Sequence, residues 1–161
     1  MANAEKNKDG TTALMVAARK GSFDTLTCLI ENGVNVDEVD DDGWTALMHA
    51  AHENHVEFMT FLLANGANLH AKTKKETTAL MIAARNGSLQ ALTLLMKEGS
   101  NVDEVDDDGW TALMYAAKEN QVECMRALLD KGANLHAKTK TKGITALMIA
   151  AGNGSLQALT L

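Results

Sequence analysis

Acidic residues are concentrated in the sequence DEVDDDGWTALM, which occurs twice, at residues 37–48 and 103–114. Five of its first six residues are acids. Carboxylates clustered in this way bind Ca²⁺ when their spacing matches a calcium loop. They also suit a solvated turn, and the letters DEVD resemble the tetrapeptide that executioner caspases prefer. The stretch is therefore open to three interpretations: a cation site, a protease target or an acidic turn.

A calcium loop of the EF-hand type needs oxygen ligands at its first, third and fifth positions, Gly at the sixth and a bidentate Glu at the twelfth. The start of the stretch fits, with Glu38, Asp40, Asp42 and Gly43. The twelfth position, however, holds His49 in the first copy and Tyr115 in the second. Because the closing ligand is missing, we expect a turn at this place and no metal. Asp and Gly are the residues that such a turn requires.

Cleavage by a caspase would fall after Asp40 or Asp106 and needs an extended, mobile backbone. The residues that follow, Asp41 and Asp107, are acidic. We expect both segments to be held in turns, so the folded chain should resist cleavage there.

Three histidines, His49, His52 and His55, recur at every third position and suggest a zinc site. The second copy has Tyr115, Lys118 and Gln121 at the corresponding positions. Since these residues do not form a zinc site, structural or surface roles are favoured for the histidines. The sequence also lacks a phosphate-binding glycine loop and a nucleophile elbow. We expect no cofactor and no enzymatic activity.

Composition limits the range of partners. The 161 residues carry a net charge of −6 and only 4% aromatic residues, which is unlike the basic, aromatic face of a nucleic-acid-binding protein. No apolar run is long enough to span a membrane, and no signal peptide is recognisable. These features predict a cytoplasmic or nuclear chain that binds neither nucleic acid nor membrane. Both cysteines, Cys28 and Cys124, lie in apolar runs and are predicted to be buried thiols.

The motif TAL recurs at intervals of 33, 33, 33 and 34 residues, beginning at Thr12, Thr45, Thr78, Thr111 and Thr145. Each unit contains two short apolar stretches separated by a break, which predicts a helix, a turn and a second helix. We expect the threonines to cap the first helices, and Ser22, Ser88 and Ser155 to cap the second ones. Gly33, Gly66, Gly99 and Gly132 should end the second helices.

A single unit of this size cannot bury both helix faces, so its stability must come from stacking on its neighbours. Pairs of alanines, such as Ala50 and Ala51, would let the helices approach closely. The sequence predicts one all-α domain over residues 1–161, with repeats at about 4–36, 37–69, 70–102, 103–135 and 136–161, the last incomplete.

The segment DGWTALMHAAHENHVEFMTFLLANGANLHA, with its period of 33 residues, resembles the ankyrin repeat. It departs from the family pattern in having Ala in place of Pro and Met in place of His at the start of the first helix. The resemblance implies a solenoid of helix-turn-helix units with β-hairpin or turn tips. It further implies a non-catalytic, monomeric module that binds another protein on its concave face.

In ankyrin arrays the partner contacts the tips and the exposed side of the first helices. Carried over to this chain, the resemblance implies binding by Asp41, Asp42, Trp44, His52, Glu53, Lys74, Lys75, Arg85, Asp107, Asp108, Trp110, Lys118, Lys140 and Lys142. The tips alternate in charge. Neighbouring tips of opposite sign could simply offset one another, or they could form a ladder that recognises a partner. Trp44 and Trp110 would then be anchors about 20 Å apart, twice the helix-packing distance.

A second hypothesis is a structural or engineered array without a specific ligand. The sequences GANLHAKTK and NGSLQALTL each occur twice, so the units alternate between two types. Duplication of a pair of repeats explains this pattern without any selected partner.

Overall fold

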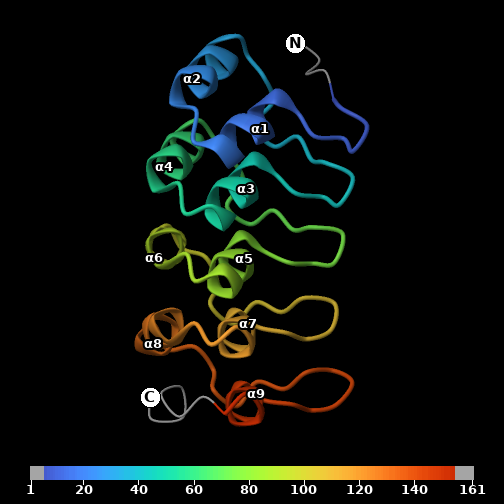
Figure 1. Ribbon diagram of the computed structural model, residues 1–161, viewed down its shortest axis with the longest axis vertical. Coiled ribbons are helices and arrows are strands. Elements are labelled where there is room, and N and C mark those ends of the chain that lie inside the picture. The colour runs from blue at the N-terminus through green and yellow to red at the C-terminus, as the bar shows by residue number, and fades with distance from the viewer. Residues whose placement is uncertain (1–5, 155–161) are drawn as a thin grey trace.

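The computed structural model describes residues 6–154. In this range the chain forms nine α-helices connected by turns and loops (Figure 1). Their bounds are α1 Ala13–Lys20, α2 Phe23–Glu31, α3 Ala46–His52, α4 Val56–Ala64, α5 Ala79–Asn86, α6 Leu89–Lys97, α7 Ala112–Lys118, α8 Val122–Asp130 and α9 Ala146–Gly152.

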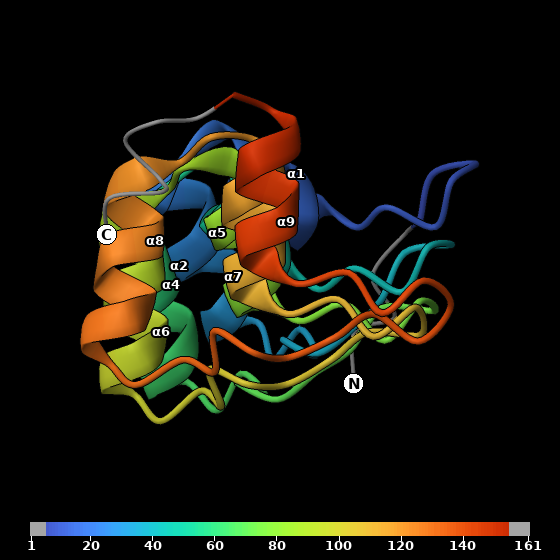
Figure 2. The same cartoon turned by 90° about the horizontal axis from the view of Figure 1, so that it is seen from below.

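The helices stand in two rows. The first row contains α1, α3, α5, α7 and α9, each packed on the next, and the second contains α2, α4, α6 and α8 (Figure 1). Long loops leave the first row and project to one side, so the array has an L-shaped cross-section (Figure 2). The prediction of an all-α repeat solenoid is confirmed. Within residues 6–154 the tips of these loops contain only isolated antiparallel bridges, Lys6 to Thr12 and Lys72 to Thr78.

The first helices begin as the sequence predicts. In each of them the hydroxyl of a threonine accepts a hydrogen bond from the backbone N–H of a methionine three residues later, as Thr45 does from Met48 at 3.3 Å. This bond satisfies one of the N–H groups that have no partner inside the helix. Asn54 and Asn120 end the turns after α3 and α7 in the left-handed conformation, with φ of 60° and 57°. Asn adopts this conformation more readily than most residues.

The predicted caps of the second helices are wrong. Ser22 and Ser88 occupy the N-cap positions, but neither hydroxyl accepts a hydrogen bond from a backbone N–H of its helix. The Ser22 hydroxyl instead lies 2.9 Å from the Thr25 hydroxyl. The Ser88 hydroxyl is buried against the preceding repeat and donates to the carbonyl of His52 at 3.0 Å. His52 is the last residue of α3, so its carbonyl has no partner in the helix. This free carbonyl accepts the hydrogen bond of the Ser88 hydroxyl, which then makes no bond to the backbone of α6. The third predicted cap, Ser155, lies outside the described residues.

The core runs along the whole array between the two rows of helices. It consists mainly of Leu, Met and Ala side chains, and Ala50 and Ala51 are fully buried, as close packing requires. In α9, by contrast, Leu147 and Met148 are 46% and 58% exposed. Their equivalents in α7, Leu113 and Met114, are covered by α9, whereas no described helix follows α9.

The two cysteines differ. Cys124 is buried, and this burial raises the pKa of its thiol to about 11. Cys28 is exposed, so the prediction that it is buried is wrong. The equivalent positions of the later second-row helices, Phe61, Leu94 and Ala127, are only half-buried, so this helical position lies at the edge of the core.

Candidate functional site

The acidic tips are built around Asp40 and Asp106. The Oδ1 atom of Asp40 accepts hydrogen bonds from the backbone N–H groups of Asp42 and Trp44, at 3.0 and 2.8 Å. In the second copy, Asp106 Oδ1 accepts from the equivalent two groups at the same distances. These carboxylates therefore hold the turn together, as the turn interpretation of the sequence predicts. Their backbone is folded into the turn and differs from the extended conformation that a protease needs.

The second oxygen of each carboxylate meets a different residue in the two copies. Asp40 Oδ2 lies 3.1 Å from His49 Nε2, whereas Asp106 Oδ2 accepts a hydrogen bond from the Tyr115 hydroxyl. Burial lowers the pKa of His49 below its usual value, although the neighbouring Asp40 acts in the opposite direction. Burial, assisted by Asp106, raises the pKa of Tyr115. Both tips are thus tied to their own first helix.

Backbone hydrogen bonds join each tip to the next along the array. The N–H of Lys74 donates to the carbonyl of Asp42 at 3.1 Å, and the N–H of Asp107 donates to the carbonyl of Lys75 at 3.2 Å. The tips approach so closely that a Cβ on Gly43 would lie 2.8 Å from the Lys74 nitrogen. Gly43 also has a φ of 84°, a value that other residues rarely adopt. The tips therefore form one continuous, hydrogen-bonded edge.

Ion pairs between neighbouring tips involve residues outside the predicted binding set. Lys6 pairs with Glu38, and Lys72 pairs with Glu104, each at 2.7 Å. The hydrogen bond from Lys72 lowers the pKa of Glu104, and the same contact raises the pKa of Lys72. The first Asp of each DEVD also bridges repeats: Asp37, for example, accepts from the N–H of Asn68 at 2.8 Å. The alternating charge of the tips was the available signal for these pairs.

The predicted charged residues of the tips stay exposed. Among the ion pairs of the described residues, none joins the predicted tip acids to the predicted tip lysines. Charge compensation between these particular side chains is therefore not observed. The charged residues of the predicted face that remain exposed are Asp41, Asp42, His52, Glu53, Lys74, Lys75, Arg85, Asp107, Asp108, Lys118, Lys140 and Lys142.

The two tryptophans, which the sequence predicts to be anchors for a partner, are half-buried. Both pack against the core. The Trp44 ring lies 5.1 Å from the ring of His49 and 6.0 Å from that of His52, measured between centroids. Trp110 lies 5.2 Å from the ring of Tyr115. Each tryptophan is therefore fixed in place by its own first helix, with part of the ring left at the surface.

The three histidines of the second repeat do not converge. His49 contacts Asp40, His52 Nδ1 lies 2.9 Å from Glu53, and His55 Nε2 lies 3.3 Å from the carbonyl of Arg19. Across residues 6–154, no group of three or more His, Cys, Asp and Glu side chains is arranged to hold a metal ion.

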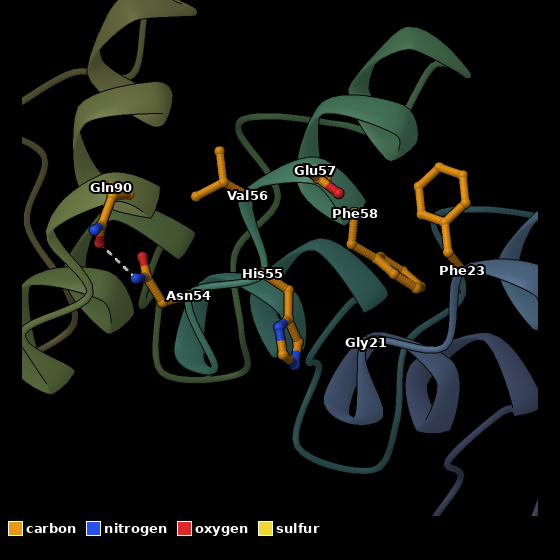
Figure 3. Close-up of a pocket in the computed structure, with 8 residues that line it drawn as sticks. All are labelled: Gly21, Phe23, Asn54, His55, Val56, Glu57, Phe58 and Gln90. Carbon is orange, nitrogen blue, oxygen red and sulfur yellow. Dashed lines mark hydrogen bonds between the residues drawn. The ribbon is translucent and has the colours of Figure 1, made fainter.

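Two hollows border the second repeat. The larger, about 400 Å³, lies at the turn between α3 and α4 and is lined by Phe23, Asn54, His55 and Gln90 among others (Figure 3). Asn54 and His55 serve to join repeats: Asn54 donates to Gln90 at 2.6 Å and accepts from the N–H of Ala91 at 2.9 Å. Asn54, His55 and Gln90 are thus occupied by contacts between repeats.

The smaller hollow, about 280 Å³, lies on the predicted binding face. It is a groove between the first and second repeats, and we call it the Trp44 groove. It is lined by Arg19, Asp40, Asp42, Trp44, His49, His52 and Glu53. Four of the predicted site residues are thus brought together in one place: Asp42, Trp44, His52 and Glu53. Arg19, which comes from the preceding repeat, was not among the predicted residues, although its equivalent two repeats later, Arg85, was.

Comparison with known proteins agrees with this architecture. The family model described as ankyrin repeats in three copies matches residues 1–73 and 65–139. The chain therefore belongs to the ankyrin-repeat family, whose members are generally protein-protein interaction modules and are typically non-enzymatic. A search of curated proteins finds no match. None of the helices described in residues 6–154 is long and apolar enough to cross a membrane.

Proposed function

We propose that the chain is a non-catalytic module that binds a partner protein on the face formed by the tips and the exposed side of the first helices. The observation that carries this proposal is the Trp44 groove. It places a half-buried aromatic ring, exposed charges and two histidines on a backbone already fixed by hydrogen bonds between tips. A rigid surface loses little conformational entropy on binding, and buried aromatic residues are frequent anchors of interfaces.

The proposed partner is a protein in the same compartment, which we take to be the cytoplasm or nucleus, and the module itself is proposed to be monomeric. The exposed charges differ from repeat to repeat, so one partner chain would meet an alternating pattern of acids and bases along the array. Charges of this kind set specificity and association rate more than affinity.

The test is capture of partners by the immobilised chain and by variants with altered surfaces. Because both tryptophans pack against the core, truncating them would also affect folding. Charge reversal at exposed positions is cleaner, so Asp42→Lys combined with Asp108→Lys serves as the face variant. Thr60→Ala combined with Thr93→Ala, at exposed positions of α4 and α6, is the matched control.

The proposal predicts that a partner retained by the wild-type chain and by the control is lost from the face variant. If retention is the same for all three, or depends only on the control positions, the proposed face is wrong. A wild-type chain that retains no partner would favour the alternative of a structural array without a specific ligand.

A further inference from the structure

The two tryptophans differ in what lies above the ring. In the fourth repeat, the ammonium group of Lys118 lies 5.5 Å from the centroid of the Trp110 ring. A cation over the face of an indole is attracted by the electrons of the ring, and Trp is the best of the aromatic residues in this role. Trp110 therefore already holds a cation that its own repeat supplies.

The second repeat has His52 where the fourth has Lys118. The imidazole is shorter than the lysine side chain, and its Nδ1 atom is engaged with Glu53 at 2.9 Å. The groove beside Trp44 is lined by this same histidine. The two copies of the tip sequence thus differ. The Trp110 ring has the Lys118 cation over it, whereas the Trp44 ring borders a groove of about 280 Å³.

The charges that line the Trp44 groove favour a cation. Three carboxylates, from Asp40, Asp42 and Glu53, face the single guanidinium of Arg19. Asp40 is used by the turn, but within residues 6–154 the side chain of Asp42 takes part in no hydrogen bond or ion pair. Beside Trp110, the equivalent of Arg19 is Arg85 of the third repeat, which lies 3.8 Å from Glu119. An arginine next to the groove is therefore compatible with a lysine over the ring.

We propose that the Trp44 groove binds a cationic side chain, lysine or arginine, of the partner protein. The ammonium or guanidinium group lies over the exposed part of the Trp44 ring and pairs with the Asp42 carboxylate. Lys118 on Trp110 is the internal equivalent of this contact. This inference rests on the proposed binding face, and it adds the chemistry of the partner residue that the groove selects.

The test is an NMR titration of the ¹⁵N-labelled protein with Nα-acetyl-lysine methylamide as the probe. The readout is the chemical shift of the two tryptophan indole N–H signals. Nα-acetyl-norleucine methylamide, with added KCl to match the ionic strength, is the neutral control of similar shape. We expect the Trp44 signal to shift in a saturable manner with the lysine compound. The norleucine compound should bind about 5-fold more weakly, the factor that corresponds to a cation–π contact of about 1 kcal/mol. The Trp110 signal should not shift.

Two variants exchange the residues that lie over the tryptophan rings in the second and fourth repeats. His52→Lys supplies an internal cation to Trp44 and should abolish the shift of its signal. Lys118→His removes the cation from Trp110 and should make that signal respond to the probe. Both positions are exposed, so both variants should keep the fold. Equal shifts with lysine and norleucine compounds, or an unchanged response of Trp44 in His52→Lys, would overturn the proposal.

Partner capture separates this inference from the proposed function. If a partner is lost from the Asp42→Lys, Asp108→Lys variant but is bound normally by His52→Lys, the face is correct and the cation site is wrong. If the probe shifts Trp44 selectively but no partner depends on the face, the groove binds cations and the proposed function fails.

Discussion

The second and fourth repeats contain the same tip sequence, yet the first helix that follows gives each tip different surroundings. In the second repeat Asp40 Oδ2 lies 3.1 Å from His49 Nε2, while Trp44 borders a groove. In the fourth, Asp106 is only 5% exposed and accepts from Tyr115, while Trp110 is covered by Lys118. The comparison teaches that the tip sequence determines the turn. The residues of the following helix, His49 and His52 or Tyr115 and Lys118, determine how the central carboxylate is held and whether the tryptophan ring is open to a partner.

The largest effect should come from removing the carboxylate at the centre of each tip. Asp106→Ala leaves two backbone N–H groups and the Tyr115 hydroxyl without their acceptor, and we expect a loss of about 3–4 kcal/mol in the free energy of unfolding. Asp40→Ala should cost less, about 2–3 kcal/mol, because His49 can turn to solvent. Urea denaturation measures both. Exposed Asp108→Ala is the control, and a loss from Asp106→Ala no greater than that of the control would contradict the role of the carboxylate.

The next largest loss of stability should come from substituting the glycine of a tip that packs against the following tip. The glycine of the last described tip has no such neighbour and serves for comparison. Gly43→Ala and Gly109→Ala should each cost about 2–3 kcal/mol, since both combine a positive φ with a close approach of the next backbone. Gly143 also has a positive φ, 60°, but a Cβ there would meet nothing within 4 Å. Gly143→Ala should therefore cost only about 1 kcal/mol. Equal losses at all three positions, by thermal or urea unfolding, would show that contact between tips adds nothing.

A smaller effect isolates the bond from Tyr115. We expect Tyr115→Phe to lower the free energy of unfolding by about 1 kcal/mol, the net value of a typical hydrogen bond. In a chain that already carries Asp106→Ala, the same substitution should have almost no effect, because its acceptor is gone. Urea denaturation of the two single variants and of the double variant gives a double-mutant cycle. Additive losses would mean that the hydroxyl does not act through Asp106.

The smallest effect is a difference in pH response between the two tips. The pKa of His49 is lower in the folded state, so the unfolded chain binds the proton more tightly. The His49 contribution to stability is present above the unfolded pKa of about 6.5 and is lost as the pH falls through the folded value. His49→Tyr should remove this part of the acid sensitivity. The pKa of Tyr115 is raised, so its contribution is present below pH 10 and is lost only at higher pH. Unfolding midpoints measured across pH test both signs, and an identical acid profile for His49→Tyr would contradict the assignment.

The repeat period allowed most of the fold to be predicted from the sequence. The threonine caps and the glycines that end the second helices depend on local backbone chemistry, which is the same in every unit, so they could be read directly. The role of Ser88 could not be predicted, because the partner of its hydroxyl, the His52 carbonyl, belongs to another repeat. The exposure of Cys28 could not be predicted either, because an apolar run does not show which of its positions lie at the edge of the core.

The same limit applies to the candidate site. The exposed charges of the tips follow from the family pattern, and the structure leaves them exposed. The orientation of Trp44 and the participation of Arg19 depend on contacts between repeats, which one unit of sequence does not contain. The different roles of His52 and Lys118 become visible only when the two tips are compared in three dimensions.

The central claim is that a partner contacts the face of the tips and first helices, and site-specific photocrosslinking tests it most directly. Benzoylphenylalanine is placed at Glu53 or Glu119, at the exposed ends of α3 and α7, or at Thr60 on α4. After irradiation with a captured partner, we predict covalent adducts from positions 53 and 119 and none from position 60. Adducts from position 60 alone would contradict the account.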